Sequence, residues 1–260
     1  MDLMRWFDGL PVGLDGNQLQ PEKVDTLALI LSKRYGEGTI VESVSRLRSK
    51  KNLVLHLIIK CNDSKHINLV AKLFISGKYD TELTLLKSSF QQGLTVPEVL
   101  AAQDGVILMT HISGEILVDR INHTFEPQLI DTLAKWYYKY HTIHKQIKGD
   151  PRLRNFICHG DGIYGVDFEE SRVGHWTLDI GGVSASLLDT DPIFDQRKRT
   201  LSWRLFDSYL SLIGETRTAV LEKMFTTAIA DSLKQTSIWR NDRNIFELSE
   251  RIRNEGLLED

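Results

Sequence analysis

Cysteine, charge asymmetry and long apolar runs are scarce in this chain, and each shortage excludes a class of protein. The 260 residues include only two cysteines, Cys61 and Cys158, without metal-ligand spacing, so we expect neither a disulfide framework nor a zinc site. No apolar run approaches the roughly 20 residues that a membrane-spanning helix needs. The first residues lack the apolar core of a signal peptide. A reducing cytoplasm is therefore the expected location.

Charge of one sign is not in excess either. Lysine and arginine number 32 against 35 aspartates and glutamates, and the resulting net charge of −3 argues against general affinity for nucleic acid. Hydrophobic residues make up 42% of the chain, as in an ordinary globular protein. The length allows a large core, in one large domain or two modest ones.

Most residues able to carry chemistry lie between positions 150 and 170. Apolar strands are predicted at 156–158 and 163–168, and the turn His159-Gly-Asp-Gly162 joins them into a hairpin. Asn155 enters this hairpin and Asp167 leaves it, so we expect both at the same end. Their oxygens are hard ligands of the kind that Mg²⁺ prefers, and Asp150 can accept a proton.

The first half of the chain predicts a small sheet. A polar N-terminal extension precedes a helix that opens at Pro21. A second helix is expected from Asp80 or Thr81 to near Gln92, with an inner face made of Leu83, Leu86 and Phe90. Alternating apolar residues predict five strands, at about 39–47, 53–60, 66–75, 97–101 and 105–109.

The second half is mostly helical. Helical spacing of apolar residues predicts helices near 127–147, 196–213, 216–235 and 244–254. A sheet-rich lobe followed by a helical lobe is an α+β architecture. We expect the first lobe at 1–110, a hinge at 111–115 and the helical lobe at 116–260. His141 and His144 share one helical face, but without an evident third ligand they are interpreted as core residues rather than a metal site.

Lys72 is the most informative residue outside the hairpin, because it interrupts the apolar strand face that Val70 and Phe74 define. An unpaired ammonium on that face costs several kcal/mol, so Lys72 must find an anion or reach water. Glu82, near the start of the next helix, is the natural partner. The alternative is an edge-strand lysine whose charged end extends into solvent.

The order of these features along the chain resembles the protein-kinase-like superfamily. The features are a strand lysine, a helical glutamate, a glycine-containing linker, the Asp-x-x-x-x-Asn of 150–155, a hairpin and Asp167-Phe. The resemblance covers roughly residues 38–190. The short interval after Asp167, without Ala-Pro-Glu, is similar to the branch of aminoglycoside phosphotransferases, choline kinases and lipopolysaccharide sugar kinases. The resemblance implies a two-lobed α+β fold, with an antiparallel-sheet N-lobe that has one helix and a mainly helical C-lobe.

The resemblance also implies a nucleotide site in the first lobe. It assigns Lys72 to the α- and β-phosphates of ATP and Glu82 to an ion pair with Lys72. It places Met109 at the back of the adenine pocket, and it assigns the hydrogen bonds with adenine to the backbones of Thr110 and Ile112.

In the second lobe, the resemblance implies that Asp150 is the catalytic base and that Asn155 and Asp167 are Mg²⁺ ligands. Arg152 and Arg154 could neutralise charge on the γ-phosphate, or could form ordinary surface salt bridges. Asp179 resembles the aspartate that follows the hairpin in aminoglycoside and choline kinases, and we interpret it as structural.

The implied function is an ATP- and Mg²⁺-dependent transfer of the γ-phosphate to a hydroxyl of a small molecule or sugar. The partners would be ATP and that acceptor. Small atypical Ser/Thr protein kinases also lack a long activation segment, so a protein acceptor stays open.

Three departures from the family pattern support another alternative. The basic turn at 45–52 replaces a glycine-rich loop, Lys148 replaces the usual histidine before Asp150, and Glu169 replaces the glycine after Asp167-Phe168. A nucleotide-binding pseudokinase or interaction module therefore remains open. A helical interaction protein with an accidental resemblance is a third interpretation.

Overall fold

The structure is a computed structural model that describes residues 3, 20–49 and 51–258. The N-terminal extension, apart from Leu3 and Gln20, and Lys50 of the basic turn lie outside the described residues. The chain divides into two compact units. Unit 1 comprises Met1–Phe90 with Pro97–Ile112, and unit 2 comprises Gln91–Val96 with Ser113–Asp260. The hinge expected at 111–115 stays a prediction.

Unit 1 is built on an antiparallel sheet of five described strands in the order β1-β2-β3-β5-β4. This confirms the predicted sheet. Its elements in chain order are α1 (Pro21–Tyr35), β1 (Ile40–Leu47), β2 (Leu53–Lys60), β3 (His66–Leu73), α2 (Tyr79–Gln91), β4 (Val99–Gln103) and β5 (Val106–Thr110).

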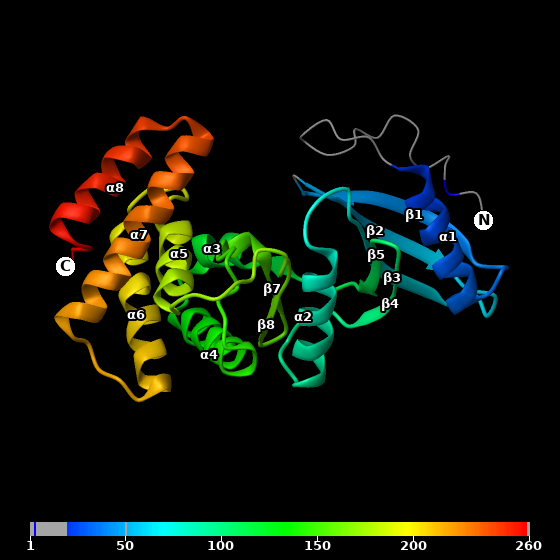
Figure 1. Ribbon diagram of the computed structural model, residues 1–260, viewed down its shortest axis with the longest axis horizontal. Helices are drawn as coiled ribbons and strands as arrows, with labels where there is room; N and C mark the ends of the chain where they lie inside the picture. Colours follow the sequence, from blue (N-terminus) through cyan, green and yellow to red (C-terminus); the bar gives the residue numbers. More distant parts are fainter. Residues whose placement is uncertain (1–2, 4–19, 50, 259–260) are drawn as a thin grey trace. The chain divides into compact units, whose positions relative to one another are not determined.

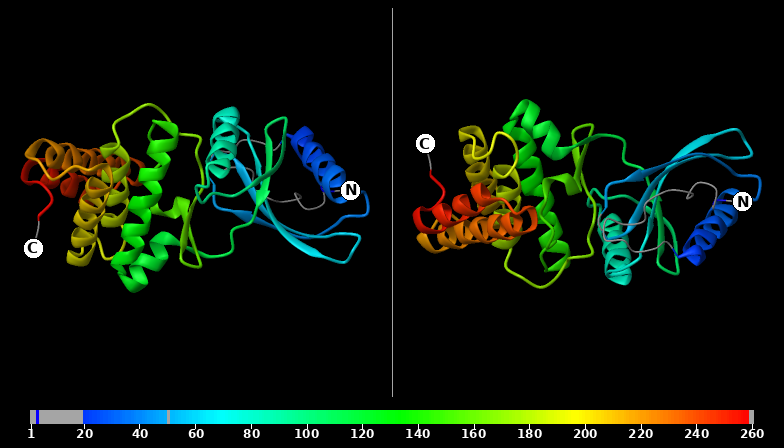
Figure 2. Two further views of the ribbon diagram at one scale, coloured as in Figure 1. Left: turned by 90° about the horizontal axis from the view of Figure 1, so that it is seen from below. Right: turned by 90° about the horizontal axis from the view of Figure 1, so that it is seen from above.

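The two helices of unit 1 cover opposite faces of this sheet (Figures 1 and 2). On one face, Leu27 and Leu31 of α1 join a buried core with Ala71 and Leu73 of β3. Because successive side chains of a strand point to opposite faces, Lys72 points to the face that α2 covers.

The inner face of α2 differs from our expectation. The buried residues are Glu82, Leu85, Leu86 and Ser89, whereas Phe90 is 45% exposed. These four follow the helical spacing of three and four residues from Glu82. The helix is therefore oriented with Glu82 toward the sheet. The buried face begins at this charged residue and not at Leu83, where we expected it to begin.

Unit 2 combines a small sheet with helices, and all the helices expected from the sequence are present. Its elements are β6 (Glu115–Ile116), α3 (Leu117–Thr124), α4 (Pro127–His144), a 3₁₀ turn (Leu153–Asn155), β7 (Phe156–His159), β8 (Gly162–Gly165), α5 (Thr177–Leu188), α6 (Gln196–Ile213), α7 (Ala219–Arg240) and α8 (Arg243–Glu255). In the described part of the chain, none of the helices combines the length and the apolar character that crossing a membrane demands.

The start of α7 was predicted three residues too early. Thr218 has φ of −128° and its side chain accepts a hydrogen bond from the Leu221 N–H, so it caps the helix rather than joining it. The short elements β6 and α3 were not predicted, since two or eight residues carry little periodic signal.

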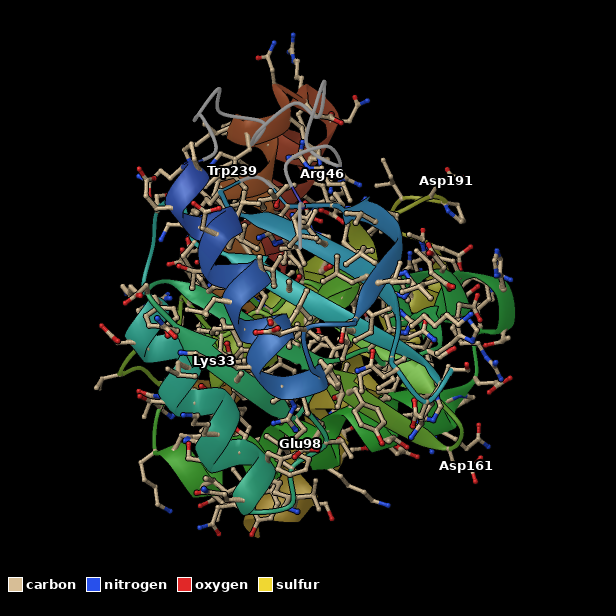
Figure 3. All side chains as sticks on the ribbon, turned by 90° about the vertical axis from the view of Figure 1, so that its right-hand side faces the viewer. Lys33, Arg46, Glu98, Asp161, Asp191 and Trp239 are labelled. Atoms are coloured by element: carbon tan, nitrogen blue, oxygen red, sulfur yellow. The ribbon has the colours of Figure 1, made fainter. Side chains whose placement is uncertain are left out.

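The hairpin predicted around Gly160 is confirmed, with Phe156 paired to Gly165 and His159 to Gly162. Asp161 lies at its exposed turn (Figure 3). The second strand ends at Gly165 rather than at Phe168, because Asp167 adopts a left-handed φ of 64° that interrupts extended backbone.

Gly165 allows this hairpin to lie against α4. A Cβ added at Gly165 would come within 2.2 Å of the indole ring of Trp136, which is itself buried on α4. The Trp136 ring packs edge-on against Phe156, with 5.0 Å between ring centroids. The hairpin is therefore anchored to α4 at the end where Asn155 and Asp167 lie.

We predict that Gly165→Ala lowers the free energy of unfolding by about 1–3 kcal/mol, because the new methyl group overpacks the site against Trp136. Gly162→Ala is the matched control on the same strand, since a Cβ there meets its nearest neighbours at 3.5 Å or more. Urea denaturation measures both variants. Equal stability of the two would contradict the close approach.

Candidate functional site

Lys72 lies on a central strand, between β2 and β5, and is only 6% exposed. Its Nζ is 2.5 Å from Oε2 of Glu82 on α2. The expected contact is therefore present, and the alternative of an edge-strand lysine in water is wrong. Because removing either charge of a buried ion pair is costly, this contact restrains the position of the Lys72 ammonium.

Several other side chains lie on the same sheet face as Lys72. Val54 is paired with Lys72, and His56 is paired with Val70, which is paired in turn with Met109. The His56 ring stacks on His111, with 4.2 Å between centroids. Burial and then the neighbouring His56 lower the pKa of His111. This stack was not predicted, because the two histidines are distant in sequence.

Met109 is buried on β5, and Thr110 ends that strand. The Thr110 N–H donates to the Glu98 carbonyl at 3.0 Å, and the Thr110 hydroxyl accepts from the Glu98 N–H at 3.0 Å. Ile112, half-buried, is the last residue of unit 1. The roles of Met109, Thr110 and Ile112 toward adenine stay predictions.

Asp150 is a buried carboxylate in unit 2 whose two oxygens are both bound by Arg152. The Arg152 Nε donates to Oδ1 at 2.5 Å and its Nη2 donates to Oδ2. Burial raises the pKa of Asp150, but the hydrogen bonds of Arg152 and the charges of Lys148 and Arg152 outweigh it, so the pKa lies below its ordinary value. Asp150 is therefore an anion at neutral pH.

The second arginine of this loop has a different position. Arg154 is half-buried on the 3₁₀ turn Leu153–Asn155, whereas Arg152 precedes that turn and reaches back to Asp150. The structure thus brings Arg152 to the carboxylate. The alternative to a role at the γ-phosphate was a salt bridge, and Arg152 does form one, with Asp150 itself.

Asn155 and Asp167 lie at the same end of the hairpin, as the sequence predicts. The Val166 N–H donates to the Asn155 carbonyl at 2.9 Å, which places Asp167 one residue from this contact. The side-chain nitrogen of Asn155 donates to the Asp150 carbonyl at 3.4 Å, so its amide oxygen is directed away from that carbonyl. An amide oxygen and a carboxylate are ligands suited to Mg²⁺.

Asp179 supports the loop that precedes Asp150. It is fully buried near the start of α5, and its oxygens accept from the backbone N–H groups of Lys148 at 2.6 Å and Gly149 at 3.0 Å. Gly149 has φ of 81°, and a Cβ there would lie 2.1 Å from the Glu170 carbonyl. The interpretation of Asp179 as structural is supported by these contacts.

Two residues of this support were not identified from the sequence. His141 on α4 lies 2.9 Å from Asp179 through Nε2 and 2.7 Å from the Tyr209 hydroxyl through Nδ1, so both of its ring nitrogens are engaged by neighbouring helices. In the sequence Lys148 is only a departure from the family pattern, whereas in the structure its ammonium donates to the carbonyls of Asp150 and Asp167. The partners of His141 are distant in sequence, and those of Lys148 are backbone atoms. Neither kind of contact produces a local pattern in the sequence.

We predict that Lys72→Met or Glu82→Leu alone lowers the free energy of unfolding by about 3–5 kcal/mol, because each breaks a buried ion pair by removing one of its two charges. The double variant should lose less than the sum of the two, since it replaces both charges by apolar groups. Urea denaturation of the three variants gives the coupling energy. Additive losses would contradict a direct ion pair.

Comparison with known proteins finds similarity in structure rather than in sequence. No family model matches the sequence, and no curated protein matches it either. The structure is similar to a choline/ethanolamine kinase family protein from Mesorhizobium loti, with a TM-score of 0.60, 13% identity, and coverage of 89% of this chain and 94% of that one.

Two further solved structures are similar over most of their length. Amicoumacin kinase hAmiN has a TM-score of 0.56 and 13% identity, with coverage of 98% of this chain and 92% of that one. APH(2″)-IIIa, an aminoglycoside phosphotransferase, has a TM-score of 0.55 and 12% identity, with coverage of 89% and 98%. The chain therefore has the kinase-like α+β fold of these choline/ethanolamine kinase, amicoumacin kinase and aminoglycoside phosphotransferase structures.

Proposed function

We propose that the chain is an ATP- and Mg²⁺-dependent phosphotransferase that acts on a hydroxyl of a small molecule or sugar. The observation that carries the proposal is the loop and hairpin of unit 2, where an anionic Asp150 is joined by hydrogen bonds to Asn155 and, through Lys148, to Asp167. The structural neighbours support it. One is a complex with AMP-PNP and Ca²⁺, and another is a complex with GDP and kanamycin.

In this proposal, unit 1 binds the nucleotide. The Lys72 ammonium binds phosphate oxygens, and Glu82 keeps that ammonium in place through their 2.5 Å contact. Met109 lines the base site, the Thr110 carbonyl accepts from the base, and the Ile112 N–H donates to it. The Thr110 N–H is engaged by Glu98, which leaves the Ile112 N–H as the assigned donor.

Unit 2 supplies the metal ligands and the base. Asn155 and Asp167 would hold Mg²⁺, which neutralises phosphate charge when it is bound. Asp150 orients the acceptor hydroxyl and accepts its proton. Arg152 occupies one lone pair on each oxygen of Asp150, and a carboxylate has about four such sites, so the hydroxyl can still bind. Arg152 and Arg154 can then neutralise charge on the transferred phosphate.

We predict that Asp150→Ala lowers the rate of phosphate transfer by about 10²–10⁴-fold, because the acceptor hydroxyl loses its base. Nucleotide binding should stay within a few-fold of the wild type. Asp161→Ala, at the exposed turn of the same hairpin, is the matched control and should transfer normally. The measurements are ATP turnover with a panel of hydroxyl-bearing acceptors, and calorimetric titration with AMP-PNP.

The same assay tests the alternative of a nucleotide-binding module without transfer. That alternative is favoured by the basic turn at 45–52, which replaces a glycine-rich loop. AMP-PNP binding without turnover on sugars, amino alcohols, aminoglycosides or Ser/Thr peptides would support it. Turnover only on the peptides would favour a protein kinase, and Asp150-dependent turnover on the small molecules supports our proposal.

Arg152 also generates a pH prediction. Because its hydrogen bonds and charge lower the pKa of Asp150, Arg152→Ala should raise that pKa, so that more Asp150 is protonated in mild acid. The ratio of kcat/KM at about pH 5 to that at about pH 7.5 should fall relative to the wild type. Arg154→Ala should leave this ratio unchanged. An equal change in both variants would contradict the specific contact.

A further inference from the structure

Unit 2 buries two lysines completely, Lys148 and Lys198, and their ammonium groups bind different segments of the chain. The Lys198 ammonium donates to Thr190 and to the Pro192 carbonyl, in the loop between α5 and α6. The Lys148 ammonium is placed between the two segments that carry the proposed chemistry. An ammonium removed from water is costly, so each must be stabilised by what surrounds it.

The Lys148 Nζ donates to the Asp150 carbonyl at 3.0 Å and to the Asp167 carbonyl at 2.8 Å. The rings of Phe156 and Phe168 lie close to the same ammonium, with centroids 5.6 and 5.3 Å from Nζ. One cation therefore connects the loop of the proposed base to Asp167, two residues after the end of β8, through charge-assisted hydrogen bonds.

The contact falls where the backbone is strained. Asp167 has φ of 64°, a left-handed conformation that is unfavourable for a residue with a side chain. A hydrogen bond to the Asp167 carbonyl offsets this cost and favours the peptide orientation that the strain requires. On the other side, the backbone N–H of Lys148 is bound by Asp179, so the lysine itself has a fixed anchor.

We propose that Lys148 is a positioning residue that sets the distance between Asp150 and Asp167, and thereby the affinity of Asn155 and Asp167 for a divalent cation. This inference rests on the proposed function of that pair as metal ligands. Lys148 would act through the backbone, because its ammonium donates to the carbonyls of Asp150 and Asp167.

Donor number explains why lysine suits this position. An ammonium carries three N–H donors and can serve both carbonyls at once, whereas neutral histidine has one N–H. Methionine retains most of the length of lysine and removes every donor. The carbonyls of Asp150 and Asp167 would then lose a shared partner, and the strained Asp167 would be free to reorient.

The test compares Lys148→Met with Lys198→Met, which removes an equally buried ammonium that also binds carbonyls but lies in the loop between α5 and α6. Mn²⁺ binding in the presence of AMP-PNP is followed by electron paramagnetic resonance. We expect Lys148→Met to weaken Mn²⁺ binding by about tenfold or more, the usual effect of residues that orient metal ligands. Lys198→Met should stay within about twofold of the wild type.

Hydrogen exchange provides a readout without metal. The peptide that spans Val166–Glu170 should exchange faster in Lys148→Met than in the wild type, and at the wild-type rate in Lys198→Met. If Lys148→Met does not fold, Lys148→Gln keeps a neutral donor for one carbonyl, and a several-fold loss of Mn²⁺ affinity is expected for it.

The outcomes separate this inference from the function on which it rests. A wild type that binds Mn²⁺ with AMP-PNP, together with a folded Lys148 variant that binds equally well, overturns the positioning role alone. Equal losses in Lys148→Met and Lys198→Met also overturn it, because they indicate a general effect of removing a buried charge. A wild type that binds no Mn²⁺ overturns both the proposed metal site and this inference.

Discussion

The buried carboxylate of Asp179 is the interaction on which the arrangement of unit 2 depends. It accepts the backbone N–H groups of Lys148 and Gly149 and contacts His141, so it joins α5, α4 and the loop before Asp150. A carboxylate removed from water is stable only with hydrogen-bond partners of this kind. In turn, the carboxylate restrains the backbone of Lys148 and Gly149 and the ring of His141. Asp179 thereby holds the backbone that leads to Asp150, whose carboxylate is bound by Arg152.

Both units use buried charge to position other groups, but in different ways. In unit 1, the ammonium of Lys72 is paired with a side chain, Glu82, whose place on α2 determines which face of that helix is buried. In unit 2, the ammonium of Lys148 binds carbonyls and approaches two aromatic rings. In the first arrangement a side-chain carboxylate restrains the ammonium, whereas in the second the ammonium binds the backbone of two segments.

The parts of the fold that could be predicted have strong local patterns. The strands of unit 1 alternate in polarity, and the hairpin at 156–165 combines apolar strands with a glycine turn. The pairing of Lys72 with Glu82 followed from the cost of a lone charge on an apolar face. By contrast, the exposure of Phe90 was missed, because helical spacing alone does not show which of two neighbouring stripes turns inward.

The sequence by itself determined the fold class, the order of the elements and the set of polar residues that enter the hairpin. Only the tertiary structure decided that Arg152 contacts Asp150, that His56 stacks on His111 and that Lys148 binds the carbonyls of Asp150 and Asp167. The physical reason is that periodicity records the burial of side chains along one element. Contacts between distant elements, and above all contacts with backbone atoms that every residue possesses, leave no pattern in the residues themselves.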